Sequence, residues 1–120
     1  MARLVFMGTP LFSVPSLLAL DERHQVVGVV TQPDRPAGRG RKLVTSPVKE
    51  VALARGLPVF QPQSLREPEA VRRLGAWQPE AIVVAAFGQI LEKPVLDLAP
   101  HGCLNIHPSL LPRYRGASPV

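Results

Sequence analysis

Residues 81–87, Ala-Ile-Val-Val-Ala-Ala-Phe, are the most apolar run of this chain and decide its expected fold. Pro79 precedes the run and Gly88 follows it, so that a turn residue stands near each end. A short apolar run between such residues is typical of a central strand in a parallel sheet, which is buried on both of its faces. Helices must then cover those two faces, and the run therefore predicts an α/β protein.

Strand and helix patterns alternate along the rest of the chain. Apolar and β-branched runs predict four further strands, at residues 3–7, 25–31, 58–60 and 102–107. Helices are expected at about residues 15–20, 46–55, 67–77 and 94–98, where Pro15 and Pro47 stand in first turns and Ser46 provides an N-cap. Residues 32–45 have no periodicity and are expected to form a loop. This alternation predicts a doubly wound, mostly parallel five-stranded sheet.

Three turns that are far apart in the sequence are expected to meet at one edge of this sheet. They are Gly8 after the first strand, Phe87 and Gly88 after the fourth, and residues 105–107 after the fifth. The carboxyl ends of parallel strands share an edge, and a crevice opens there at the point where the strand order reverses. The sequence therefore predicts a binding site between these turns.

The last strand leads into the most informative motif, Leu-Asn-Ile-His-Pro-Ser-Leu-Leu-Pro-Arg-Tyr-Arg-Gly at residues 104–116. Alternate side chains of a strand share a face, so Asn105 and His107 are expected about 6.7 Å apart and able to donate to one small polar atom. Pro108 lacks an N–H and is expected to end the strand. An isolated Asn-x-His is more often structural than functional, so this tripeptide alone does not establish a site.

The complete motif resembles the signature of the folate-dependent formyltransferases, whose fold is Rossmann-like. This resemblance implies that Asn105 and His107 polarise the formyl group of 10-formyltetrahydrofolate. It also implies that the next segment lines the folate site, through Ser109, Leu110, Leu111 and Pro112. A second segment is similar to the pterin-binding segment of the family and adds Phe87, Gly88, Gln89, Ile90 and Leu91 to that site. Core packing is the competing interpretation of this second segment when it is taken alone.

The turn after the first strand, Gly8-Thr9-Pro10, contains one glycine where a dinucleotide fingerprint has three, and it lacks the lysine of a P-loop. A binding site for NAD or ATP is therefore not expected. In the formyltransferases this turn lines the acceptor side of the cleft, which implies that role for Gly8 and Thr9. Leu11 stands where the tRNA-specific members often have an acidic residue, so the resemblance provides no carboxylate at this position.

The expected loop at residues 32–45 is strongly basic. Its cations are Arg35, Arg39, Arg41 and Lys42, and Asp34 alone opposes them. A structureless loop of this length is uncommon in a small domain and is often functional, although a solvated basic loop would have the same composition. The segment resembles the insertion loop with which the tRNA-specific members engage the acceptor stem of initiator tRNA. The resemblance therefore implies that these four cations bind tRNA.

As a whole, the resemblance implies a transferase of translation initiation that moves a formyl group from 10-formyltetrahydrofolate to the α-amine of initiator methionyl-tRNA. The catalytic aspartate and the C-terminal tRNA-binding domain of such enzymes match nothing in these residues. Residues 1–120 are therefore expected to be an incomplete N-terminal formyltransferase domain, truncated and inactive by itself. A UDP-aminosugar formyltransferase and a non-catalytic folate- or RNA-binding module are the alternatives.

Composition is consistent with a globular domain that binds an anionic partner. Hydrophobic residues make up 46% of the 120 residues, and the formal net charge is +5. Neither a signal peptide nor a membrane-spanning segment is expected, so the expected location is cytoplasmic. Cys103 is the only cysteine, which excludes an internal disulfide and favours a buried side chain over a nucleophile. The expected partners are folate and tRNA, without DNA, membrane or metal, in a full-length protein that is a monomer.

Overall fold

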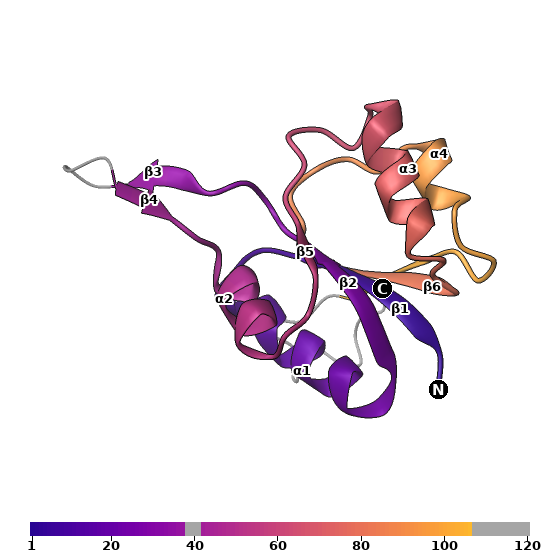
Figure 1. The fold of residues 1–120 in the computed structure, drawn as a ribbon, viewed down its shortest axis with the longest axis horizontal. Coiled ribbons are helices and arrows are strands. Elements are labelled where there is room, and N and C mark those ends of the chain that lie inside the picture. The colour runs from indigo at the N-terminus through magenta and orange to yellow at the C-terminus, as the bar shows by residue number, and fades with distance from the viewer. Residues whose placement is uncertain (38–41, 107–120) are drawn as a thin grey trace, which may run out of the picture.

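The centre of the computed structural model, which describes residues 1–37 and 42–106, is a five-stranded sheet (Figure 1). Its strands are β1 (Arg3–Gly8), β2 (Gln25–Val30), β5 (Val59–Phe60), β6 (Ala81–Ala85) and β7 (Cys103–Asn105). They lie in the order β5-β2-β1-β6-β7, and every neighbouring pair is parallel. The predicted doubly wound parallel sheet is therefore confirmed.

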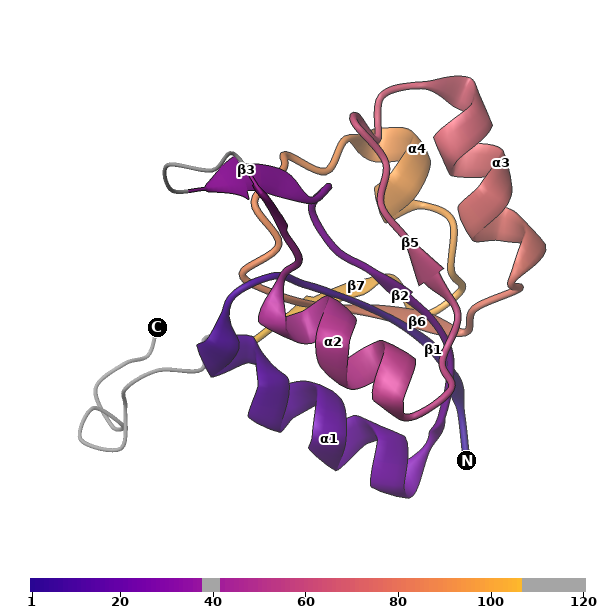
Figure 2. The same cartoon turned by 60° about the vertical axis from the view of Figure 1, so that its left-hand side comes forward.

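Helices cover both faces of this sheet, as Figures 1 and 2 show. The helices α1 (Val14–Arg23) and α2 (Pro47–Ala54) lie on one face, while α3 (Pro68–Ala76) and α4 (Lys93–Leu96) lie on the other. A short 3-10 helix, η1 (Leu11–Ser13), precedes α1. Side chains of β1 alternate between the two layers, so that Met7 joins the apolar cluster of Leu74 and Phe6 joins that of Leu17. All residues of β6 are buried, as predicted for a strand covered on both faces.

Local sequence signals set the start and the end of α2. Ser46 Oγ accepts a hydrogen bond from the backbone N–H of Lys49 at 3.0 Å, and Pro47 occupies the first turn. Gly56, with a φ of +73°, follows the helix in a left-handed conformation that glycine adopts without a steric penalty. The predicted N-cap and stop of this helix are both confirmed.

A close contact between β2 and the end of α3 explains one glycine inside a strand. A Cβ added to Gly28 would lie 2.4 Å from atoms of the Trp77 ring, so only a glycine leaves room for that ring. The Trp77 ring in turn meets the ring of Phe60 edge-on, with 6.5 Å between the ring centres. The amphipathic helix predicted at residues 67–77 is thus confirmed, with Leu74 buried and Val71 packed against the same cluster.

Part of the basic segment forms a hairpin where a loop was expected. The strands β3 (Arg35–Ala37) and β4 (Lys42–Val44) pair in antiparallel register, with Arg35 opposite Val44. This hairpin stands out from the parallel sheet in Figures 1 and 2. The prediction of an unstructured loop was wrong for these two strands, because runs of three residues are too short to show the alternation by which strands are recognised.

Candidate functional site

The strand order reverses beside β1, and this reversal fixes where a ligand can enter. The strands β2 and β5 follow β1 in the chain and lie on one side of it in the sheet. The next two strands of the sheet, β6 and β7, lie on the other side of β1. In chain order the sheet therefore reads 3-2-1-4-5, which is the order of the first five strands of a Rossmann sheet. The carboxyl ends of β1 and β6 flank the switch point, where such sheets bind their ligands.

The turns after β1 and β6 are joined directly at this edge. Thr9 Oγ1 donates a hydrogen bond to the carbonyl oxygen of Phe87 at 2.8 Å, and Ser13 Oγ donates to the carbonyl oxygen of Ala85. A Cβ added to Gly8 would lie 2.9 Å from the same Ala85 carbonyl oxygen, so the two chains approach closely. The structure thus brings together the first two of the three turns that the sequence predicted to converge.

A cavity of about 420 Å³ opens where β6 and β7 end. Its lining from β6 and the following turn comprises Val84, Ala86, Phe87, Gln89 and Leu91. Leu96 of α4 and Cys103 and Asn105 of the neighbouring strand β7 complete the lining. Three residues of the predicted pterin-binding segment and the predicted formyl-polarising Asn105 therefore line one cavity, whose volume suits a small organic ligand.

Two residues with a positive φ shape the turn that lines this cavity. Ala86 has a φ of +62° and Gly88 a φ of +106°, while the buried side chain of Phe87 between them is anchored in the core. A left-handed alanine costs about 1–2 kcal/mol, and residues held in this way cluster at functional sites. The strand predicted for residues 81–87 therefore ends at Ala85, because the left-handed turn leaves the ladder there. Gly88 and Ile90 line a neighbouring hollow of about 320 Å³, which shares Gln89 with the cavity.

The end of β7 presents one member of the predicted Asn–His pair. Asn105 is exposed and pairs with Val84 in the ladder, and the N–H of Ile106 still donates to the Val84 carbonyl oxygen at 2.8 Å. His107 lies outside the described residues, as do Ser109, Leu110, Leu111 and Pro112.

Cys103 is half-buried, which corrects the expectation of a buried side chain, and its partial burial raises the pKa of the thiol. A thiol with a raised pKa is a poor nucleophile, in agreement with the sequence.

A polar cluster of Asp34, Lys49 and Gln61, which was not predicted from the sequence, anchors the base of the hairpin. Gln61 Nε2 donates to Asp34 Oδ1 at 2.7 Å, and the Lys49 ammonium forms an ion pair with Asp34 Oδ2 at 3.0 Å. The Gln61 hydrogen bond and then the Lys49 interactions hold the pKa of Asp34 below its ordinary value. Gln61 also donates to the carbonyl oxygen of Gln32 at 3.2 Å. Asp34 is therefore an anchor of the hairpin and does not neutralise its exposed cations.

The hairpin approaches the predicted acceptor-side turn. A hollow of about 150 Å³ has Thr9 and Gln32 on one side and Arg35, Val44 and Thr45 on the other. Arg35 and Lys42 are exposed at the two strands of the hairpin, while Arg39 and Arg41 lie outside the described residues. Two of the four predicted tRNA-binding cations thus sit on an element that projects next to the switch point (Figure 2).

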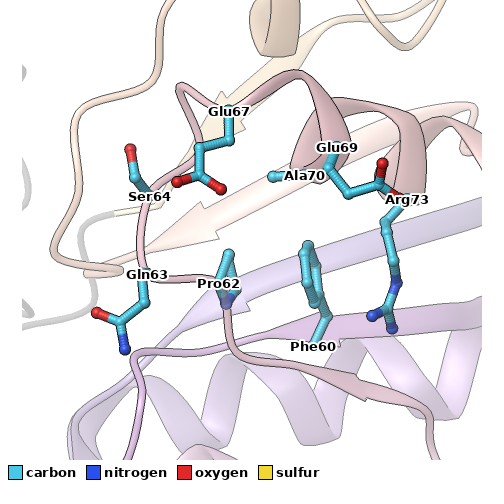
Figure 3. A pocket seen from close by; sticks show the side chains of 8 residues that line it. All are labelled: Phe60, Pro62, Gln63, Ser64, Glu67, Glu69, Ala70 and Arg73. Carbon is cyan, nitrogen blue, oxygen red and sulfur yellow. The ribbon is translucent and has the colours of Figure 1, made fainter.

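A further hollow of about 290 Å³ lies between the end of β5 and the start of α3 (Figure 3). The guanidinium of Arg73 covers the ring of Phe60 there, 4.3 Å from the ring centre. None of its lining residues comes from β1, β6 or β7, so this hollow is away from the switch point.

Within residues 1–37 and 42–106, no group of three or more His, Cys, Asp or Glu side chains could hold a metal ion. No helix in the described part of the chain is long and apolar enough to cross a membrane.

The order of the sheet and the cavity at its carboxyl edge define a Rossmann-like α/β domain with a small-molecule cavity beside its switch point. The sequence places this domain more narrowly: the chain belongs to the formyl transferase family, whose sequence pattern matches residues 2–120. The resemblance noted in the sequence is thereby confirmed at the level of the family.

Comparisons with individual proteins agree with this assignment. The chain is 63% identical over 118 residues to a methionyl-tRNA formyltransferase of Xanthomonas campestris pv. campestris, and 59% identical over 119 residues to one of Hydrogenovibrio crunogenus. Each alignment covers 98% of this chain, which spans only 38% of the length of these relatives. Among solved structures, a glycinamide ribonucleotide transformylase from Symbiobacterium toebii has the same fold, with a TM-score of 0.67 and 21% identity over 95% of this chain and 55% of that chain.

Proposed function

We propose that the longer protein to which this chain belongs transfers the formyl group of 10-formyltetrahydrofolate to the α-amine of initiator methionyl-tRNA. Its close relatives bear the name of that activity, and the match covers nearly the whole chain. The observation that carries the proposal is the cavity at the ends of β6 and β7, which Gln89 and Leu91 of the pterin-like segment line together with Asn105. The same resemblance supports a cytoplasmic, monomeric full-length protein.

The cavity is suited to a flat heterocycle with polar edges. Phe87 and Leu91 supply apolar surface, while the turn at residues 86–91 offers backbone groups to a ring edge. Asn105 is an exposed member of this lining, and its side-chain N–H groups would donate to an oxygen of a bound formyl group. The folate-site role of Ser109, Leu110, Leu111 and Pro112 is part of the same proposal.

In this reaction the α-amine attacks the formyl carbon, and an oxyanion develops on the formyl oxygen. Asn105 would donate a hydrogen bond to that oxyanion, and one such donor stabilises a transition state by roughly 3–4 kcal/mol. His107 would act beside it, as a second donor and in proton transfer to the departing folate nitrogen. The aspartate that completes this set in the family would come from residues outside the 120, as would the C-terminal tRNA-binding domain.

The hairpin is the proposed contact for the acceptor stem. Arg35 and Lys42 are exposed on it, and Arg39 and Arg41 belong to the segment that joins its strands. Because Thr9 and Arg35 line one hollow, a nucleic acid held by the hairpin would be close to the acceptor-side turn at Gly8 and Thr9. This arrangement favours a tRNA substrate over a UDP-aminosugar, which needs no projecting basic hairpin.

An assay of the full-length protein with alternative acceptors tests the proposal. With 10-formyltetrahydrofolate as donor, we expect rapid formation of formyl-methionyl-tRNA and no formylation of a UDP-aminosugar. Formyl transfer to the sugar alone would show that the other branch of the family is correct. Binding of folate and tRNA without any transfer would favour a non-catalytic binding module.

A further inference from the structure

Gln32 connects the segments that follow β1, β2, β5 and β6 at the ligand-binding edge of the sheet. It is the second residue after β2, and its backbone N–H donates to Thr9 Oγ1 after β1 at 3.4 Å. Its carbonyl oxygen accepts a hydrogen bond from Gln61 after β5 at 3.2 Å. Its side chain reaches the turn after β6, which lines the cavity. One half-buried residue thus joins four strand ends, two of them through its backbone and the turn after β6 through its side chain.

The orientation of the Gln32 amide is fixed by a chain of hydrogen bonds. Gln89 Oε1 accepts from the backbone N–H of Leu65 at 3.0 Å, which can only donate. Gln89 Nε2 must therefore point the other way, and it donates to Gln32 Oε1 at 2.8 Å and to the Pro62 carbonyl oxygen at 3.1 Å. With its oxygen occupied, Gln32 directs Nε2 to the carbonyl oxygen of Gly88 at 3.2 Å. Both amides thus have one favourable orientation, set by backbone groups at either end.

The segment that this amide contacts, residues 86–91, contains two residues with a positive φ and depends on its neighbours to keep that conformation. Ala86 and Gly88 both have a positive φ, and glycine in particular can relax to many other conformations once its contacts are lost. The Gln32 amide packs directly on Gly88, since a Cβ built there would be 2.7 Å from Gln32 Nε2. Gln32 therefore provides both a hydrogen bond and a steric wall to residues 86–91.

We propose that Gln32 is a positioning residue for the formyl-donor site: it holds residues 86–91 in the shape that lines the cavity and so sets the affinity for folate. This inference rests on the proposed function for the identity of the ligand. A segment that occupies its binding shape only part of the time binds with an affinity reduced by that fraction. Loss of two hydrogen bonds to the segment corresponds to a weakening of up to about 30-fold.

The test compares Gln32→Ala with Gln25→Ala in the full-length protein. Gln25 is the exposed first residue of the same strand, at the opposite edge of the sheet, so it controls for the substitution itself. Calorimetric titration with tetrahydrofolate is expected to give a Kd up to about 30-fold higher for Gln32→Ala and an unchanged Kd for Gln25→Ala. In steady-state formylation, KM for the formyl donor should rise while KM for methionyl-tRNA stays the same.

The possible outcomes separate this inference from the proposed function. If the wild type does not bind tetrahydrofolate, the proposed function itself fails. If the wild type binds but Gln32→Ala binds equally well, Gln32 does not position the segment. A parallel rise of both KM values would indicate general damage and would also overturn the inference. Should Gln32→Ala fail to fold, Gln32→Glu keeps the acceptor for Gln89 and removes only the donor to Gly88, and a smaller rise in Kd, of about five-fold, is expected.

Discussion

The substitution of Gly88 by alanine tests how much the shape of the cavity-lining turn matters. A φ of +106° is well outside the left-handed region near +60° that alanine can enter, so the strain alone costs about 1–3 kcal/mol. The new Cβ would also lie 2.7 Å from Gln32 Nε2. The Gln32 amide must then move, which removes its hydrogen bonds to Gly88 and Gln89 at about 1 kcal/mol each. The expected loss of unfolding free energy is about 3–5 kcal/mol in total.

Gly56 provides a matched control for this substitution. It also has a positive φ, of +73°, but no atom lies within 4 Å of a Cβ built on it. Gly56→Ala should therefore cost only the backbone strain, about 1 kcal/mol, and should leave folate binding unchanged. Urea denaturation of the full-length variants measures both losses, and calorimetric titration with tetrahydrofolate measures binding. Equal losses of stability for the two variants, or equal folate affinity, would refute the reasoning about Gly88.

Three further predictions concern catalysis, tRNA and pH. Asn105→Ala and His107→Ala, made separately in the full-length protein, should each lower kcat by about 10²–10³-fold with little change in folate affinity; a rise in KM at constant kcat would assign them to binding instead. Arg39→Ala should reduce the slope of log tRNA affinity against log salt by about one and leave folate affinity intact, whereas superimposable salt series would indicate a solvated loop. Because the pKa of Asp34 is lowered in the folded protein, the ionised carboxylate anchors the hairpin fully at pH values above the ordinary carboxyl pKa. This stabilisation is lost as the pH falls through the lower pKa of the folded protein. The NMR signal of the Gln61 side-chain amide should shift over that acidic range in the wild type, and a similar shift in Asp34→Asn would contradict the assignment.

The layered fold could be predicted because its signals are local. The apolar run at residues 81–87, the N-cap at Ser46 and the helical stripe that includes Leu74 each reflect a neighbourhood of a few residues. The convergence of Thr9 and Phe87 followed from topology, because parallel strands end at one edge of a sheet. These inferences needed no knowledge of side-chain contacts.

The hairpin and the glutamine cluster could not be predicted in the same way. The strands β3 and β4 form through cross-strand pairing, and Pro36 inside one of them reads locally as a strand breaker. Gln32, Gln61 and Gln89 each follow a strand, and this shared placement is the signal that could have revealed them. A single glutamine has no signature of its own, so the pattern becomes visible only once the strand ends are known to meet.

The central claim is that the cavity at the ends of β6 and β7 binds the formyl donor. Hydrogen exchange of the full-length protein, measured with and without tetrahydrofolate, tests this claim most directly. Binding at this cavity predicts slower exchange within residues 86–91 and 103–105, which supply most of its lining. Exchange in residues 67–73, beside the hollow of Figure 3, should not change. Protection confined to residues 67–73, with none at residues 86–91, would contradict the account.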